Sequence, residues 1–174
     1  LASIVDEKLP EADDPMELIP RTRLLVHDAR RWIGASLDRA VSCKIPMRLC
    51  LGDVHAEHFL FEGDRLTGLI DFGALTIDSD AVDLGRYLSS ICSSEPLDAL
   101  LDFYAERMPF DEEMRTVAKC VARVSGVLAC LNWLNWLIVR KIDFVDRRRA
   151  YARWAHVLDL AERAKRMGIG SEES

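Results

Sequence analysis

Two aspartates that each follow a short apolar run organise the middle of this sequence. The run at 47–51 is apolar apart from one arginine and ends one glycine before Asp53, and the run at 66–70 ends at Asp71. A Gly-Asp turn at 63–64, with a short apolar run on each side, is typical of a β-hairpin. We expect this hairpin to place the segment after Asp53 beside the segment before Asp71, so that the two carboxylates share one site.

Such a pair of carboxylates suits phosphoryl transfer. One accepts the proton of the attacking hydroxyl, and the second holds a divalent ion that neutralises the phosphate oxygens. The residues around the pair are Gly52, Asp53 and His55, then Ile70-Asp71-Phe72-Gly73, then Asp83-Leu84. This series resembles the catalytic core of the aminoglycoside phosphotransferase and choline-kinase-like superfamily, relatives of protein kinases, whose pattern reads H-G-D-x-H-x-x-N, then I-D-F, then D-L.

The resemblance implies a role for each matching side chain. Asp53 would be the catalytic base, and Asp71 would be a metal ligand. Asp83 would be the buried carboxylate that holds the catalytic loop by its backbone N–H groups, and His55 would support the same loop. An exposed Asp83 in the first turn of a helix is the alternative. The cofactors implied are ATP and Mg²⁺.

Two positions depart from the family pattern. Leu51 stands where the first histidine is usual, and His58 stands where the family has a metal-binding asparagine. Mg²⁺ prefers oxygen ligands and imidazole suits Zn²⁺ and later metals, so His58 as a metal ligand allows another divalent ion. His58 could instead hydrogen-bond a metal-bound water or the phosphate, or simply pack at the start of a strand.

The resemblance covers about residues 47–90 and implies a protein-kinase-like C-terminal lobe. Related kinases place a β-rich lobe with a Gly-rich phosphate loop and a strand lysine before this region, and neither feature occurs here. We therefore expect a fragment of a longer kinase that lacks its N-terminal lobe and is inactive alone, or a reduced protein that does not use nucleotide in the usual way. Residues 1–13 would be a linker or cut end, 14–168 the lobe, and 169–174 a disordered tail.

The expected fold is α+β and mostly helical, a small β-hairpin core with about five helices. Apolar residues at helical spacing predict a first helix from about 14 to 40 and a second from about 79 to 91. Three more are expected at about 95–107, 111–141 and 144–167, with residues 73–78 as a loop. Gly126 is a candidate for a close helix crossing, and the Trp-rich segment 133–136 is expected in the core.

Composition restricts the partners. A net charge of −6 and a pI near 5.3 argue against general nucleic-acid or membrane-surface binding. No stretch reaches the ~18 to 20 uncharged apolar residues that a membrane span needs, so we expect no transmembrane helix. The five cysteines are odd in number and lack C-x-x-C spacing, which favours free buried thiols and a cytoplasmic location.

Three functions remain to be weighed. The first is ATP-dependent phosphotransfer to a hydroxyl of a small molecule, an amino alcohol, homoserine, a sugar or an aminoglycoside. The second is a catalytically inactive kinase-like binding or regulatory module, which the two departures favour. The third, a metallophosphoesterase, shares only the D-x-H opening and lacks the G-D-x-x-D and G-N-H motifs that should follow. Acids at 78, 98, 102 and 106 could receive a cationic acceptor or could be solvated helix faces.

Overall fold

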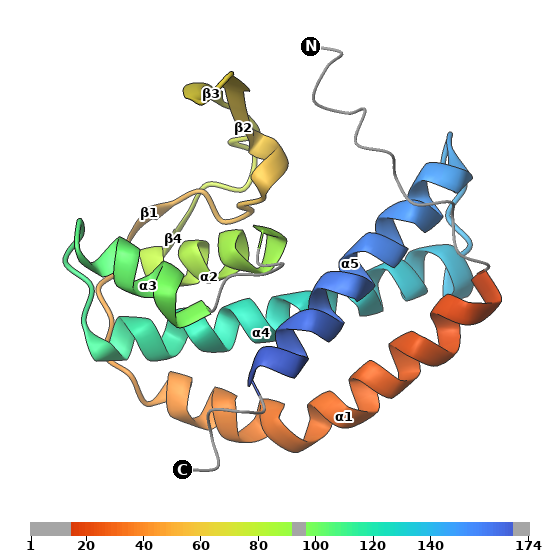
Figure 1. The fold of residues 1–174 in the computed structure, drawn as a ribbon, viewed down its shortest axis with the longest axis horizontal. Coiled ribbons are helices and arrows are strands. Elements are labelled where there is room, and N and C mark those ends of the chain that lie inside the picture. Colours follow the sequence, from red (N-terminus) through yellow and green to blue (C-terminus); the bar gives the residue numbers. More distant parts are fainter. Residues whose placement is uncertain (1–14, 92–96, 169–174) are drawn as a thin grey trace.

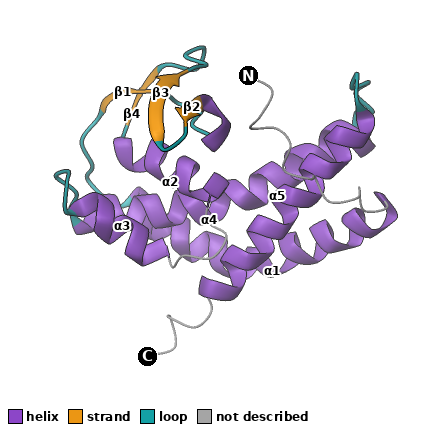
Figure 2. Ribbon diagram, turned by 45° about the horizontal axis from the view of Figure 1, so that its top comes forward, coloured by secondary structure: helices purple, strands orange, loops and turns teal. Residues whose placement is uncertain are grey.

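A computed structural model describes residues 15–91 and 97–168 of the chain, with side chains described for 16–91 and 97–163. Its helices form one broad layer, and two small sheets sit together on one side of that layer, above α2 (Figures 1 and 2). The expectations for residues 1–13 and 169–174 lie outside the described residues. The expectation of a mostly helical α+β fold is confirmed.

The central helix of the layer is α4 (Glu112–Leu134), which contacts α1, α2 and α5. Asp111 caps its start by accepting a hydrogen bond from the Met114 N–H at 2.8 Å, and the helix continues as a π-helical turn, η2 (Asn135–Val139). The π turn lets the chain leave the helix at 139 rather than at the expected 141. By length and composition Glu112–Val139 could also cross a membrane, contrary to the expectation from the sequence, and the core helix of a soluble protein passes the same test.

Helices α1 (Pro15–Val41) and α5 (Arg147–Gly168) pack together and against α4. Their contact includes Trp154, which is fully buried and donates a hydrogen bond from Nε1 to Oγ1 of Thr22 at 3.1 Å. Arg21 reaches across the same contact to the carboxylates of Asp159 and Glu162, at 2.6 and 2.9 Å. The buried side chains of this first core come mainly from these three helices: Leu18, Leu25, Ala29, Val127, Cys130, Trp154, Ala155, Leu158 and Ala161.

A second core lies where α2 (Asp80–Ile91) and α3 (Leu97–Ala105) cover the first half of α4. Gly85 allows α2 to approach closely, because a Cβ at that position would lie 2.7 Å from the carbonyl oxygen of Ala118 and from Cβ of Val121. Gly126 plays a milder part toward α5, where a Cβ would meet Cβ of Ala161 at 3.3 Å. These contacts fix α2, the helix that carries Asp83, against the centre of the layer.

The strands form two antiparallel pairs. The expected hairpin is present as β2 (Phe59–Glu62) and β3 (Arg65–Leu69), with a bulge between Leu60 and Phe61. The other pair joins β1 (Arg48–Cys50) to β4 (Thr76–Asp78). Residues 73–78 were expected to be a loop, and that expectation is wrong for the last three. A three-residue strand whose partner is far away in the sequence leaves no local pattern to detect.

The helix boundaries also differ from the expected ones. The third helix ends at 105 rather than 107, while its expected start at 95 lies outside the described residues, and the last helix begins at 147 rather than 144. Asp146 accounts for the later start, since its side chain accepts a hydrogen bond from the Arg149 N–H at 2.9 Å and so caps the helix.

Candidate active site

The loop that follows β1 is held from below by the carboxylate of Asp83. Its Oδ2 accepts a hydrogen bond from the Leu51 N–H at 2.7 Å, and its Oδ1 accepts one from the Gly52 N–H at 3.1 Å. The Asp83 side chain is 16% exposed, so these bonds supply the donors that a largely buried carboxylate needs. Because the donors are backbone groups, a leucine at position 51 serves this contact as well as a histidine.

Gly52 gives the loop a turn that other residues could not make. Its φ is +78°, and a Cβ there would collide with the carbonyl oxygen of Ala74. The absent side chain therefore lets the loop after β1 pass directly against the segment that leads into β4. Asp53 follows at once and is 57% exposed, so its carboxylate is accessible to a ligand.

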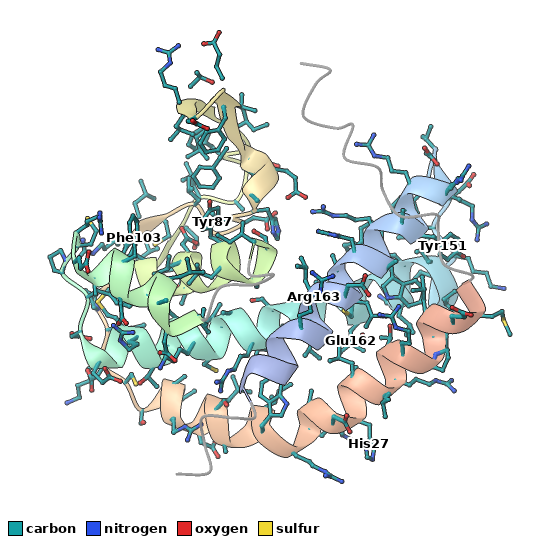
Figure 3. All side chains as sticks on the ribbon, viewed as in Figure 1. His27, Tyr87, Phe103, Tyr151, Glu162 and Arg163 are labelled. Atoms are coloured by element: carbon teal, nitrogen blue, oxygen red, sulfur yellow. The ribbon has the colours of Figure 1, made fainter. Side chains whose placement is uncertain are left out.

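A short helix, η1 (Ala56–His58), links this loop to the hairpin. The Ala56 N–H donates to Oγ of Ser90 on α2 at 3.1 Å. The hairpin itself rests on α2 through a ring contact between Phe59 and Tyr87, whose centroids are 4.9 Å apart; Tyr87 is labelled beneath the hairpin in Figure 3. The Ile70 N–H donates to the carbonyl of His58 at 3.0 Å, which joins the two ends of the hairpin beside the loop.

A series of contacts connects the two aspartates through two imidazoles. Nε2 of His55 lies 2.9 Å from Oδ1 of Asp53, and Nε2 of His58 lies 3.8 Å from Oδ2 of Asp71. The rings of His55 and His58 meet edge to face with centroids 5.5 Å apart. Asp71 is 60% exposed while His58 is only 17% exposed, so the carboxylate reaches solvent and the imidazole stands behind it. Four of the five polar residues expected at the site are thus neighbours, and the fifth, Asp83, binds the backbone of the same loop.

Asp71 holds an uncommon backbone conformation, with φ at +67°. This left-handed region is tolerated best by glycine, asparagine and aspartate. The turn directs the chain from β3 toward Gly73 and β4 and leaves the carboxylate beside His58. No local sequence pattern predicts this conformation, because aspartate is common in ordinary turns too.

Asp71 and His58 are suitable as part of a metal site but do not make a complete one. Among the described residues, no three His, Cys, Asp or Glu side chains are grouped closely enough to hold an ion by themselves. Mg²⁺ in kinases is bound by one or two protein ligands, with water and substrate phosphates completing its octahedron. The Asp71 carboxylate fits that donor set, whereas the His58 imidazole suits Zn²⁺ and later metals better.

Two contacts of the loop were not expected from the sequence. Glu57 of η1 forms an ion pair with Arg153 of α5, and nothing in the local pattern connects these positions. Burial raises the pKa of Glu57, but the hydrogen bond with its own backbone, Arg153 and His55 outweigh it, so its pKa lies below the ordinary 4.5. Arg86 lies 3.6 Å from Asp83 and 3.8 Å from Asp78. Its contact with Asp83 could have been predicted, because side chains three residues apart are neighbours on a helix.

Comparisons with known proteins match the part of the chain that carries the site. The profile of a family described as "Phosphotransferase enzyme family" matches residues 5–119, which include every residue of the site except Arg153. The chain is similar to a homoserine kinase of Rhodopseudomonas palustris (strain BisB5), 30% identical over 128 residues that make up 67% of this chain and 37% of that protein. The chain therefore spans little more than a third of the length of this curated relative. No solved structure matches the chain significantly.

Proposed function

The chain belongs to the phosphotransferase enzyme family, and from that premise we propose that it is the catalytic lobe of a kinase that transfers a phosphoryl group from ATP to a hydroxyl of a small molecule. The observation that carries the proposal is the series of contacts from Asp53 through His55 and His58 to Asp71. It brings a carboxylate suited to proton transfer and a carboxylate suited to metal binding into one exposed site.

Asp53 is proposed as the base. As the acceptor oxygen forms its bond to the γ-phosphorus, the bond from that phosphorus to the bridging oxygen breaks, ADP leaves, and the hydroxyl proton passes to the Asp53 carboxylate. His55, 2.9 Å away, holds that carboxylate in place. Asp83 contributes indirectly, because its two hydrogen bonds to the loop fix the backbone just before Asp53.

Asp71 and His58 are proposed to hold the divalent ion, Mg²⁺ or another. When bound, such an ion would neutralise the charge of the phosphate oxygens. Asp71 offers the exposed oxygen ligand, and His58 either completes the pair or orients the carboxylate from behind. The alternative role for His58 is a hydrogen bond from its ring to a metal-bound water or to a phosphate oxygen.

A separate nucleotide-binding lobe is proposed as the partner of this chain. Leu49 and Ile77 are opposite each other in the β1–β4 pair and are 71% and 65% exposed. Phe72 and Leu75, in the segment between Asp71 and β4, are about half exposed. Exposed apolar side chains that lie together often mark a contact surface. An N-terminal lobe, with the adenine beneath it, would cover these four side chains. The described cysteines, Cys43, Cys50, Cys120 and Cys130, are free, which supports a reducing, cytoplasmic setting.

The acceptor is proposed to be an amino alcohol or hydroxy amino acid, with homoserine as the first compound to assay because the relative is named for it. The rival function is an inactive regulatory module, favoured by His58 in the asparagine position. Turnover of a panel of homoserine, amino alcohols, sugars and aminoglycosides by the full-length gene product separates the two. ADP release that depends on one acceptor supports the kinase, and none with any acceptor supports the module.

The metal role has its own test, Asp71→Asn. Asparagine also tolerates a positive φ, so the fold should persist while the charged ligand is lost. We expect the full-length variant to lose divalent-ion-dependent ATP binding, measured by calorimetry with and without Mg²⁺. Asp64→Asn, in the exposed hairpin turn, is the matched control and should bind as the parent does. Equal Mg·ATP affinity in Asp71→Asn and the parent would remove Asp71 from the metal site.

A further inference from the structure

One arginine of α2, Arg86, lies beside the carboxylate that holds the Asp53 loop. Its Nη1 is 3.6 Å from Oδ1 of Asp83, one turn earlier in the helix, and 3.8 Å from Oδ2 of Asp78. Asp78 ends β4, and Asp83 binds the backbone of the loop after β1. One guanidinium therefore lies between the supports of two separate segments of the site.

The two carboxylates beside Arg86 are close enough for their charges to interact. Each has an oxygen within 3.8 Å of the same nitrogen atom, and the side chains of Asp83 and Asp78 are only 16% and 28% exposed. Partial burial weakens the screening by water, so two like charges repel each other more here than on an open surface. Both charges also reach the end of β1, where burial raises the pKa of the Cys50 thiol and Asp83 and Asp78 raise it further. A cation between the two carboxylates offsets their repulsion.

The Nη1 group of Arg86 contributes charge rather than a hydrogen bond. It is buried and, among the described residues, has no hydrogen-bond partner. Both oxygens of Asp83 already accept backbone N–H groups of the loop, at 2.7 and 3.1 Å, and Oδ1 of Asp78 accepts the Ser79 N–H at 2.8 Å. A buried donor without a partner destabilises a fold, so the gain that offsets this cost is electrostatic. Arginine suits that role because it keeps its charge when partly buried.

On this basis, and resting on the proposed function, we propose that Arg86 is a positioning residue for phosphoryl transfer. Its charge lets Asp83 keep both hydrogen bonds to the loop while Asp78 stays charged at the end of β4. Without that charge, Asp83 turns away from Asp78 and its bonds to the loop weaken. The backbone directly before Asp53 is then free to move, and the proposed base loses its place.

A second arginine of the same kind lies away from the site and provides a matched control. Arg115 of α4 is 17% exposed and lies 3.8 Å from Asp98 and 2.6 Å from Asp102, both on α3. It therefore also faces two carboxylates, and its ion pairs join α3 to α4 without involving a residue of the loop. Asp78 and Asp102, which were considered as acids for a cationic acceptor, are each engaged by one of these two arginines.

Hydrogen exchange tests the positioning role without any substrate. The measurement is the exchange rate of the Leu51 and Gly52 amides in the full-length protein, resolved by mass spectrometry with fragmentation. In Arg86→Met, which keeps much of the apolar stem, these two amides should exchange at least about tenfold faster, the usual effect of a weakened hydrogen bond to a charged group. Arg115→Met should leave both rates unchanged. Equal rates in Arg86→Met and the parent, or the same acceleration in both variants, would overturn the proposal.

Two further variants separate charge from packing. Arg86→Lys keeps the positive charge and should restore most of the slow exchange. Asp78→Asn, added to Arg86→Met, removes the charge that opposes Asp83, while its amide oxygen can still accept the Ser79 N–H. The double variant should therefore also exchange more slowly than Arg86→Met alone. Fast exchange in both of these variants would show that Arg86 acts by packing alone, and the proposal would fall.

Turnover connects the loop to the reaction and distinguishes failure of this inference from failure of the proposed function. We expect Arg86→Met to lower kcat of the full-length protein by about tenfold with KM for ATP unchanged, and Arg86→Lys to recover most of it. If the protein is a kinase and Arg86→Met changes neither exchange nor kcat, the kinase stands and the positioning role falls. If no acceptor is phosphorylated but the Leu51 and Gly52 amides respond as expected, the kinase falls and Arg86 remains a support of the loop.

Discussion

The carboxylate of Asp83 accepts a hydrogen bond from the backbone N–H of Leu51 at 2.7 Å. Leu51 is where the family pattern has a histidine, and the contact is unaffected because it does not use the side chain. A departure from a motif therefore weakens the inference of function only where the motif residue acts through its side chain. By that criterion His58 is the more consequential departure, since its ring lies beside Asp71.

Asp83→Asn should loosen the loop before Asp53. An amide has one acceptor oxygen, so one of the two backbone N–H groups loses its partner, at a cost of about 1–3 kcal/mol in the free energy of unfolding. Urea unfolding of the chain measures this directly. Asp80→Asn, in the same turn of α2 but without a bond to the loop, is the control and should cost less than about 1 kcal/mol because its Arg48 contact is a long ion pair. Equal costs would contradict the support role.

Asp53→Asn separates an enzyme from a module. The amide keeps the shape and loses the base, so kcat of the full-length protein should fall by roughly 10²- to 10⁴-fold with little change in ATP affinity. The melting temperature should stay close to that of the parent, because Asp53 is more than half exposed. Unchanged turnover would end the case for Asp53 as base. A loss of activity that follows a loss of stability would make it a structural residue instead.

The Glu57–Arg153 ion pair should position the loop rather than hold the fold together. Both side chains are partly exposed, so Arg153→Met should cost at most about 1 kcal/mol of stability. We expect kcat to fall about tenfold in the full-length protein, the size of a positioning loss, with KM for ATP unchanged. Arg153→Lys should restore part of it, and Arg148→Met should have no effect. A uniform rise in KM without a change in kcat would contradict positioning.

The pH range of that ion pair follows from the Glu57 pKa. Because this pKa is lower in the folded chain, the pair contributes fully above the unfolded value near 4.5 and is lost as the pH falls through the folded value. The effect of Arg153→Met on kcat should therefore be constant from pH 6 to pH 8. A strong variation over that range would show that a group other than Glu57 controls the effect.

Cys130 provides a test of burial in the alkaline range. Burial raises the pKa of this thiol from 9.0 to about 12. Because the pKa is higher in the folded chain than in the unfolded chain, the neutral thiol contributes its full stabilisation below pH 9. That contribution to the free energy of unfolding is lost as the pH rises from about 9 toward 12. The difference in unfolding free energy between the parent and Cys130→Ala should then shrink between pH 8 and pH 10.5. A difference that does not change with pH would show that the thiol titrates alike in both states.

The parts of this molecule that could be predicted are those with local causes. Helical spacing located five helices, and the Gly-Asp turn located the β2–β3 hairpin. The pairing of Thr76–Asp78 with Arg48–Cys50 could not be predicted, since each strand has three residues and the partner is distant in the sequence. The Glu57–Arg153 contact was missed for the same reason. The roles of Asp53, Asp71 and Asp83 are those that the resemblance to a kinase family implies, and they stay predictions.

The positive φ of Asp71 lowers the stability of the fold at the residue proposed to bind the metal. An aspartate in the left-handed region costs about 1 kcal/mol relative to a glycine free of that clash. A library of this chain sorted only by resistance to heat should therefore enrich Asp71→Gly and yield a sturdier protein without its proposed metal ligand. Selection for stability alone would favour glycine at this position, and selection for the function of the carboxylate would keep the aspartate.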